Sequence, residues 1–205
     1  PVSNTINITV HVPSFPVQSS GSNPGLEVLS PSTGDQSSDG NSGFYALVVD
    51  FYGSSIWFHS PTSGWEQLYS SLPQPNPSYP FTFTIILTEN SSTGDTVVST
   101  IYINNTAYTI NVNTPYPWSQ IGYVGIRGDA GNVFYVSYLG VSPAYLGPYF
   151  AMSRLYLTPA SSMTWGAIAW QAYYNGKSNL TVSFVGTFTQ GSSPPGDDLD
   201  IGLFL

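Results

Sequence analysis

The side chains that could carry out chemistry are few and lie far apart in the sequence. The 205-residue chain has two histidines, His11 and His59, and no cysteine. Protein zinc sites are built largely from Cys and His side chains, so no such metal site is expected. The Gly-x-Ser-x-Gly turn that exposes the nucleophilic serine of many hydrolases is also missing from the sequence.

Carboxylate pairs are the other catalytic arrangement to consider, because two of them can serve an acid protease or a glycosidase. Asp50, Glu66 and Asp129 lie on or beside predicted strands, without an Asp-Thr-Gly-like segment around them. The acidic cluster is interpreted as a solvated turn, since a calcium loop needs more oxygen ligands; it consists of Asp197, Asp198 and Asp200. We therefore predict no enzyme, catalytic residue, metal or cofactor, with an acid-active hydrolase such as a thermopsin-like protease as the alternative.

The sequence also contains candidate sites for N-glycosylation. Four Asn-x-Ser/Thr sequons begin at Asn7, Asn90, Asn104 and Asn179. Asn7 falls on the polar face of a predicted strand, Asn90 and Asn104 in predicted turns, and Asn179 at the start of a strand. A glycan can be tolerated at all four of these positions, and N-glycosylation is expected at most of them.

The charge content excludes several partners. Only 7% of residues are charged, with three Lys or Arg against eleven Asp or Glu. Three basic residues cannot form the positive surface that nucleic acid or anionic lipid requires. So few carboxylates also predict tolerance of acid, since little is lost when they are protonated.

The compartment is expected to be extracellular. No apolar run approaches the roughly 20 residues of a membrane span. The chain begins at Pro1 without Met, so we expect a removed signal peptide. Without cysteine, stability must come from packing, hydrogen bonds or assembly.

The N-terminal segment has the most regular pattern. Apolar residues occupy even positions from Val2 to Val12, interrupted by Asn4, and polar residues occupy the odd positions. Period two over eleven residues predicts a strand with one buried face. About thirteen strands in all, many separated by Gly- and Pro-rich turns, predict an all-β antiparallel sandwich of jelly-roll type. Residues 1–13 are predicted to be an extended strand, 14–25 a linker and 26–205 the sandwich head, with a subdivision near 143.

The first strand suggests two readings. It is either an ordinary first strand of the sandwich, or a donor that inserts into a neighbouring copy, where its main chain pairs and its side chains fill pockets. Repeated head to tail, the second arrangement makes an open filament of identical subunits. The inserting face would consist of Val2, Asn4, Ile6, Ile8, Val10 and Val12.

Residues Phe81 to Pro143 resemble part of a concanavalin-type jelly roll. The resemblance lies in the segments TFTIILT and TIYIN and in the run QIGYVGIRGDAGNVFYVSYLGVS. It favours the same fold and suggests a secreted carbohydrate-binding domain as an alternative function, with Trp and Tyr as stacking surfaces.

The chain as a whole resembles the subunits of archaeal surface threads. The matching traits are the PVSNTINITVHVP segment, the absence of Cys, the few charges and the sequons. The resemblance implies a β-sandwich head, donor-strand complementation between successive subunits and heavy N-glycosylation. The leading hypothesis is therefore a glycosylated structural subunit of an extracellular filament.

Overall fold

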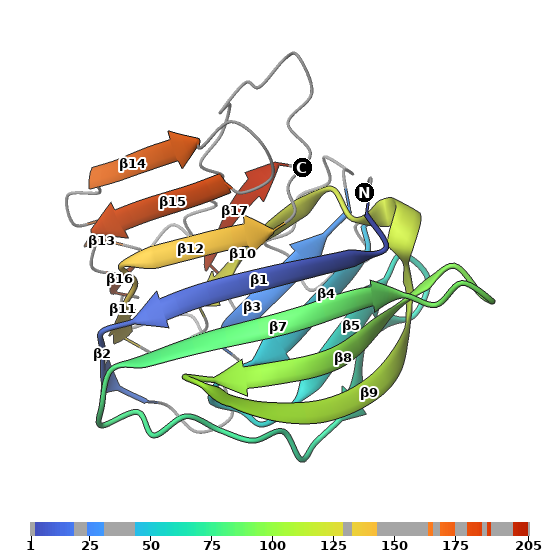
Figure 1. Cartoon of the computed structure of the whole chain (residues 1–205), viewed down its shortest axis with the longest axis horizontal. Helices are drawn as coiled ribbons and strands as arrows, with labels where there is room; N and C mark the ends of the chain where they lie inside the picture. The colour runs from blue at the N-terminus through green and yellow to red at the C-terminus, as the bar shows by residue number, and fades with distance from the viewer. Residues whose placement is uncertain are drawn as a thin grey trace.

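The protein is a sandwich of antiparallel β-sheets, as predicted (Figure 1). The computed structural model describes residues 3–18, 24–30, 44–128, 133–142, 164–165, 169–174, 180–185, 188–189 and 199–204. Two large sheets face each other, and two short two-stranded ribbons accompany them.

The first large sheet has seven strands. Their spatial order is β14 (Ala169–Tyr174), β15 (Leu180–Val185), β12 (Tyr138–Ser142), β1 (Thr5–Val12), β7 (Phe81–Glu89), β8 (Asp95–Ile103) and β9 (Thr106–Pro117). The first strand of the chain is thus the central strand of this sheet (Figure 1).

The second large sheet has six strands. Their order is β17 (Leu199–Phe204), β10 (Tyr123–Gly128), β3 (Gly25–Leu29), β4 (Ala46–Asp50), β5 (Ile56–Ser60) and β6 (Gly64–Tyr69). The short ribbons pair β2 (Ser14–Val17) with β11 (Val133–Tyr135), and β13 (Thr164–Trp165) with β16 (Phe188–Thr189). A single 3-10 turn, η1, covers Trp118–Gln120 within the described residues.

The core forms because strands of both sheets alternate apolar and polar residues. In β7 the residues Phe81, Phe83, Ile85 and Leu87 are buried, while the threonines between them are half-buried. They join apolar residues of β3, β4, β5 and β10 in one cluster between the sheets. Burial of such side chains is the main favourable contribution to the folding of a chain without disulfides.

The hairpin between β8 and β9 shows how local sequence sets a turn. Asn104 and Asn105 connect the strands, and Asn104 has a φ of 53°. Asn tolerates this left-handed conformation better than most residues. Its side chain also accepts a hydrogen bond from the Thr82 N–H at 2.9 Å. The sequence predicts a tight turn at Asn104-Asn105, and the structure confirms it.

Two segments differ from the sequence-based expectation. The predicted linker 14–25 contains β2, and β3 begins at Gly25. The sequence pattern also predicts one strand over 133–141. The structure divides it into β11 and β12, because the chain changes its pairing partner: β11 pairs with β2, and β12 with β1. A further strand that the pattern predicts over 152–157 lies outside the described residues. Strands on both sides of residue 143 share the large sheets, since β15 pairs with β12 and β17 with β10.

Tyr116 of β9 is fully buried at the edge of the core. Its hydroxyl donates a hydrogen bond to the Gln120 carbonyl at 2.9 Å. Burial, and secondly the negative charge of Glu27, raise the pKa of Tyr116 well above its ordinary value. The folded protein therefore keeps this phenol protonated at pH values where the unfolded chain ionises it.

We expect Tyr116 to make the fold sensitive to alkali. Above about pH 10 the unfolded state loses the Tyr116 proton and the folded state does not, so the free energy of unfolding falls by about 1.4 kcal/mol per pH unit from this group. Tyr116→Phe should remove that slope while costing about 1 kcal/mol at neutral pH through the lost hydrogen bond. Urea unfolding measured across alkaline pH tests this, with Tyr79→Phe as the control, because Tyr79 is 67% exposed. An equal alkaline slope in Tyr116→Phe and the wild type would contradict it.

Candidate functional site: the first strand and the outer face of its sheet

β1 lies between β7 and β12 and is antiparallel to both. Ile6, Ile8, Val10 and Val12 are at most 2% exposed and belong to the core cluster. The residues between them are half-buried and face the opposite, outer side of the sheet. The alternation read from the sequence is therefore the alternation between core and surface.

The register of β1 is defined on both of its edges. Thr9 is opposite Thr84 of β7 on one side and Gly140 of β12 on the other. The Thr9 and Thr84 hydroxyl oxygens are 2.8 Å apart, and His11 Nδ1 is 3.1 Å from the Thr82 hydroxyl. These outward-facing contacts fix the strand in addition to its backbone ladders.

Two members of the predicted inserting face are not part of this strand. Asn4 precedes β1 and is exposed. Its carbonyl accepts a hydrogen bond from the Glu89 N–H at 3.0 Å. Asn4 interrupts the apolar series because the buried strand begins after it, at Thr5. Val2 lies outside the described residues.

The connection from β1 to the rest of the sandwich is short. Pro13 alone separates β1 from β2. Phe15 of β2 is buried, and its ring contacts Phe51 and Phe134 with ring centroids 6.1 and 5.5 Å away. The chain is therefore anchored again in the core within three residues of the end of β1.

The sequons differ in accessibility. Asn104 is exposed. Asn90 is half-buried, and its side-chain oxygen accepts a hydrogen bond from the Ser92 N–H at 3.0 Å in the hairpin between β7 and β8. Asn7 is half-buried in the middle of the sheet, opposite Ser142 and Ile86. Asn179 lies outside the described residues.

The candidate carboxylates are not assembled into a described site. Asp50 is fully buried and accepts a hydrogen bond from the Ser55 hydroxyl at 2.5 Å. Ser55 Oγ in turn accepts a hydrogen bond from Trp57 Nε1 at 3.0 Å.

The other candidate carboxylates lie apart from Asp50 or outside the described residues. Glu66 is exposed on the edge strand β6, and Asp129, Asp197 and Asp198 lie outside the described residues. For Asp200 the structure describes the backbone, which pairs with Arg127. Among the described residues, no three His, Cys, Asp or Glu side chains gather as a metal site requires.

Sequence reasoning missed a polar and aromatic cluster on the outer side of the six-stranded sheet. His59 is buried and stacks on Phe44 with ring centroids 4.1 Å apart. Its ring also contacts Trp65 edge-on at 5.1 Å. The Arg127 guanidinium lies 4.6 Å from the Trp65 ring centroid. Glu27 is a further buried polar residue of this sheet. The alternation Leu26-Glu27-Val28 could have signalled that Glu27 faces away from the core.

Comparison with known proteins gives one informative relative. Over 149 residues the chain is 56% identical to a protein of Acidianus two-tailed virus named "Putative transmembrane protein ORF1334". The match covers 70% of this chain but 11% of that protein, so the chain corresponds to a small part of its relative. No protein-family model and no solved structure matches the chain. In the described residues, no helix is long and apolar enough to cross a membrane.

We expect the core-facing side of β1 to be essential for stability. Ile8→Ala should lower the free energy of unfolding by about 2–5 kcal/mol, because it leaves a cavity at a position that is fully buried. Ile86→Ala is the matched control on the outer face, where the same truncation at a half-buried site should cost less. Chemical unfolding measures both, and equal losses would show that β1 does not depend on core packing.

We expect the exposed turn sequon to be glycosylated most completely. When the chain is secreted from a host that performs N-glycosylation, peptide mass spectrometry should find higher occupancy at Asn104 than at Asn7. The reason is that Asn7 lies on a paired central strand and Asn104 is exposed in a turn. Occupancy at Asn7 above that at Asn104 would contradict this order.

Proposed function

We propose that the chain is a structural module of an extracellular filament that assembles by exchange of β1 between copies. The observation that carries the proposal is the central position of β1 between β7 and β12. A copy whose own β1 is withdrawn presents two unpaired strand edges and an open apolar groove, and the β1 of another copy has the matching sequence.

The energetics favour complete filling of that groove. Four aliphatic side chains of β1 are buried, and each contributes about 1.5–3 kcal/mol on burial. Their sum is of the order of the whole stability of a domain, about 5–15 kcal/mol. The fold therefore requires a first strand, but the contacts are the same whether that strand is its own or a neighbour's.

The hinge for the exchange is residues 12–14. Because Pro13 is the only residue between β1 and β2, β1 can leave its own sheet only by a change of backbone direction at this point. Short connections of this kind favour exchange of an element between copies. Since β2 and Phe15 stay in their own sandwich, each copy would donate one strand and accept one, which makes an open chain of subunits.

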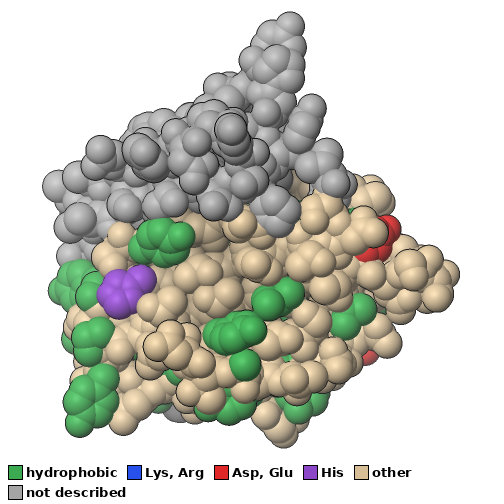
Figure 2. Space-filling view, in the orientation of Figure 1, with side chains coloured by type: hydrophobic (Ala, Val, Ile, Leu, Met, Phe, Trp, Pro, Cys, Tyr) green, Lys and Arg blue, Asp and Glu red, His purple; other side chains and the backbone are tan. Residues whose placement is uncertain are grey.

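The surface supports a location outside the cell. Figure 2 shows the outer face of the seven-stranded sheet, where neutral side chains dominate and no Lys or Arg is visible among the described residues. Glycans at Asn90 and Asn104 would extend from hairpin turns beyond the strand ends and would leave the β1 groove unobstructed. A module within a large viral protein that is named as transmembrane is consistent with display on the outside of a membrane.

Cysteine trapping tests the exchange directly, because the chain has no cysteine of its own. One preparation carries Thr9→Cys and a second carries Thr84→Cys, positions that are opposite in the register. After the two are mixed, assembled and oxidised, a disulfide-linked pair of different chains should appear on a non-reducing gel. The double variant Thr9→Cys/Thr84→Cys, oxidised as a monomer, should fix β1 in its own sheet and block assembly, which light scattering measures.

The matched control uses Ile86→Cys in one preparation and Thr100→Cys in another, since these oppose each other across β7 and β8. This pair should form no cross-link between chains, because neither strand exchanges. The proposal fails if the Thr9–Thr84 pair links no chains in samples that have assembled, or if the oxidised double variant assembles as well as the wild type.

A further inference from the structure

The Tyr138 side chain extends along β12 on the outer face of the seven-stranded sheet, with its hydroxyl end over Gly140. Tyr138 and Gly140 both point outward from β12, because Leu139 and Val141 are in the core. A Cβ atom on residue 140 would be 2.6 Å from Tyr138 Cζ and 2.9 Å from Cε1, and still closer to the hydroxyl oxygen. The absence of a side chain at Gly140 is thus what allows the ring to lie down along the strand.

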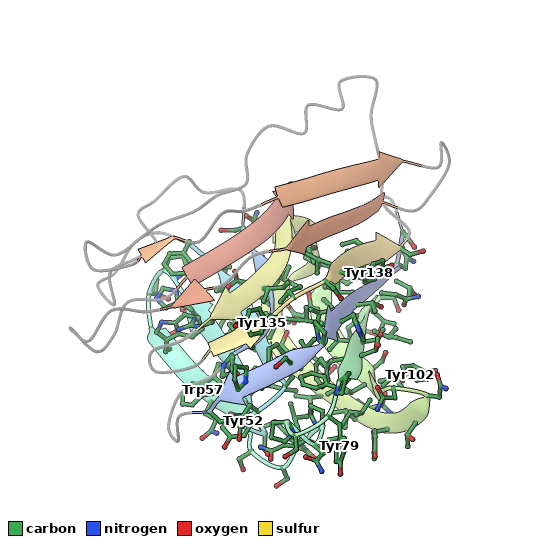
Figure 3. All side chains as sticks on the ribbon, turned by 90° about the vertical axis from the view of Figure 1, so that its left-hand side faces the viewer. Tyr52, Trp57, Tyr79, Tyr102, Tyr135 and Tyr138 are labelled. Atoms are coloured by element: carbon green, nitrogen blue, oxygen red, sulfur yellow. The ribbon has the colours of Figure 1, made fainter. Side chains whose placement is uncertain are left out.

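The ring forms one end of a row that crosses four strands. Gly140, which the ring covers, is opposite Thr9 of β1; Thr9 is opposite Thr84 of β7. Thr84 is in turn opposite Tyr102 of β8. The row of two tyrosines with two threonines between them spans three strand spacings, about 14 Å. Figure 3 shows Tyr138 and Tyr102 on the right of the view, away from Tyr52, Trp57 and Tyr135.

The hydroxyls of this row retain hydrogen-bonding capacity. The Thr9 and Thr84 hydroxyls contact each other at 2.8 Å. Since each hydroxyl has one donor and two acceptor positions, this contact leaves one donor and three acceptors for a ligand. The next row of the same face adds the half-buried His11 and Thr82.

The chemistry of the surface defines the class of ligand. The outward positions of β1, β7 and β12 carry no Asp, Glu, Lys or Arg: they are Thr5, Asn7, Thr9, His11, Thr82, Thr84, Ile86, Thr88, Tyr138, Gly140 and Ser142. A charged ligand would therefore lose hydration without gaining an ionic partner. Flat aromatic rings offer an apolar face, while hydroxyls between them offer directional hydrogen bonds.

We propose that this row, from Tyr138 over Gly140 through Thr9 and Thr84 to Tyr102, binds a neutral oligosaccharide. Sugar rings have an apolar face of C–H groups that can stack on a tyrosine and equatorial hydroxyls that can bond to the threonines. The length of the row accommodates several linked rings. The site does not depend on strand exchange, because the same row forms whichever copy supplies β1.

The test uses the full chain made in a host without N-glycosylation, so that no attached glycan occupies the face. An array of neutral oligosaccharides of glucose, mannose, galactose and N-acetylglucosamine identifies a ligand, and titration calorimetry measures its affinity. We expect binding, with Tyr138→Ala weakening the affinity about tenfold, the effect of losing one aromatic contact. Tyr102→Ala should weaken it too. Tyr79→Ala is the control, because Tyr79 is an exposed tyrosine of a loop outside the row.

Gly140→Ala tests the geometry of the ring. It should reduce affinity although both tyrosines remain, because the new Cβ displaces the Tyr138 ring from the strand. Tyr138→Phe, which keeps the ring, should retain most of the binding. If melting temperatures show that Tyr138→Ala is unfolded, Tyr102→Ala and Gly140→Ala carry the test. Absence of binding to every neutral oligosaccharide would overturn the proposal, as would affinities of the folded Tyr138→Ala, Tyr102→Ala and Gly140→Ala variants equal to that of Tyr79→Ala.

Discussion

The seven-stranded sheet depends on the pairing of β1 with two neighbours that come from distant parts of the chain. Its partners β7 and β12 lie about 70 and 130 residues later in the sequence. Without β1 the sheet would separate into β7, β8 and β9 on one side and β12, β15 and β14 on the other, and each part would expose an unpaired edge. Leaving a buried backbone N–H or C=O group without a hydrogen-bond partner costs more free energy than a typical hydrogen bond contributes to stability. β1 therefore joins the two parts of the seven-stranded sheet.

The two faces of this sheet show how few charges a stable surface needs. The inner face is aliphatic and aromatic, and the outer face is held in water by hydroxyl, amide and imidazole groups. The hydroxyls of Thr9 and Thr84 hydrogen-bond to each other across β1 and β7. Two charged residues of the six-stranded sheet contact other side chains instead. Asp50 accepts a hydrogen bond from the Ser55 hydroxyl, and the Arg127 guanidinium lies over the Trp65 ring.

Much of the fold could be predicted because period-two alternation maps directly onto a sheet with one buried face. The alternation predicts a strand over 81–88, which is observed at Phe81–Glu89, and a strand within 1–13, which is observed at Thr5–Val12. The short strand β2 escaped prediction because its Pro and Ser residues are typical of loops, and it forms by pairing with β11. Residues 133–141 are predicted as one strand for a similar reason, since the change of pairing partner between β11 and β12 leaves no mark in the sequence pattern.

The sequence by itself determined the all-β class, the buried face of the first strand and the positions of the sequons, because these depend on local periodicity and short motifs. The tertiary structure alone decided that the first strand is central, that the Tyr138 ring end lies over Gly140 opposite Thr9, and that Asn7 is set in a paired sheet. Each of these depends on contacts between residues more than a hundred positions apart, or on which neighbours flank a strand. The apolar/polar alternation of one strand does not identify its partner strands, because any strand with the same period could pair with it.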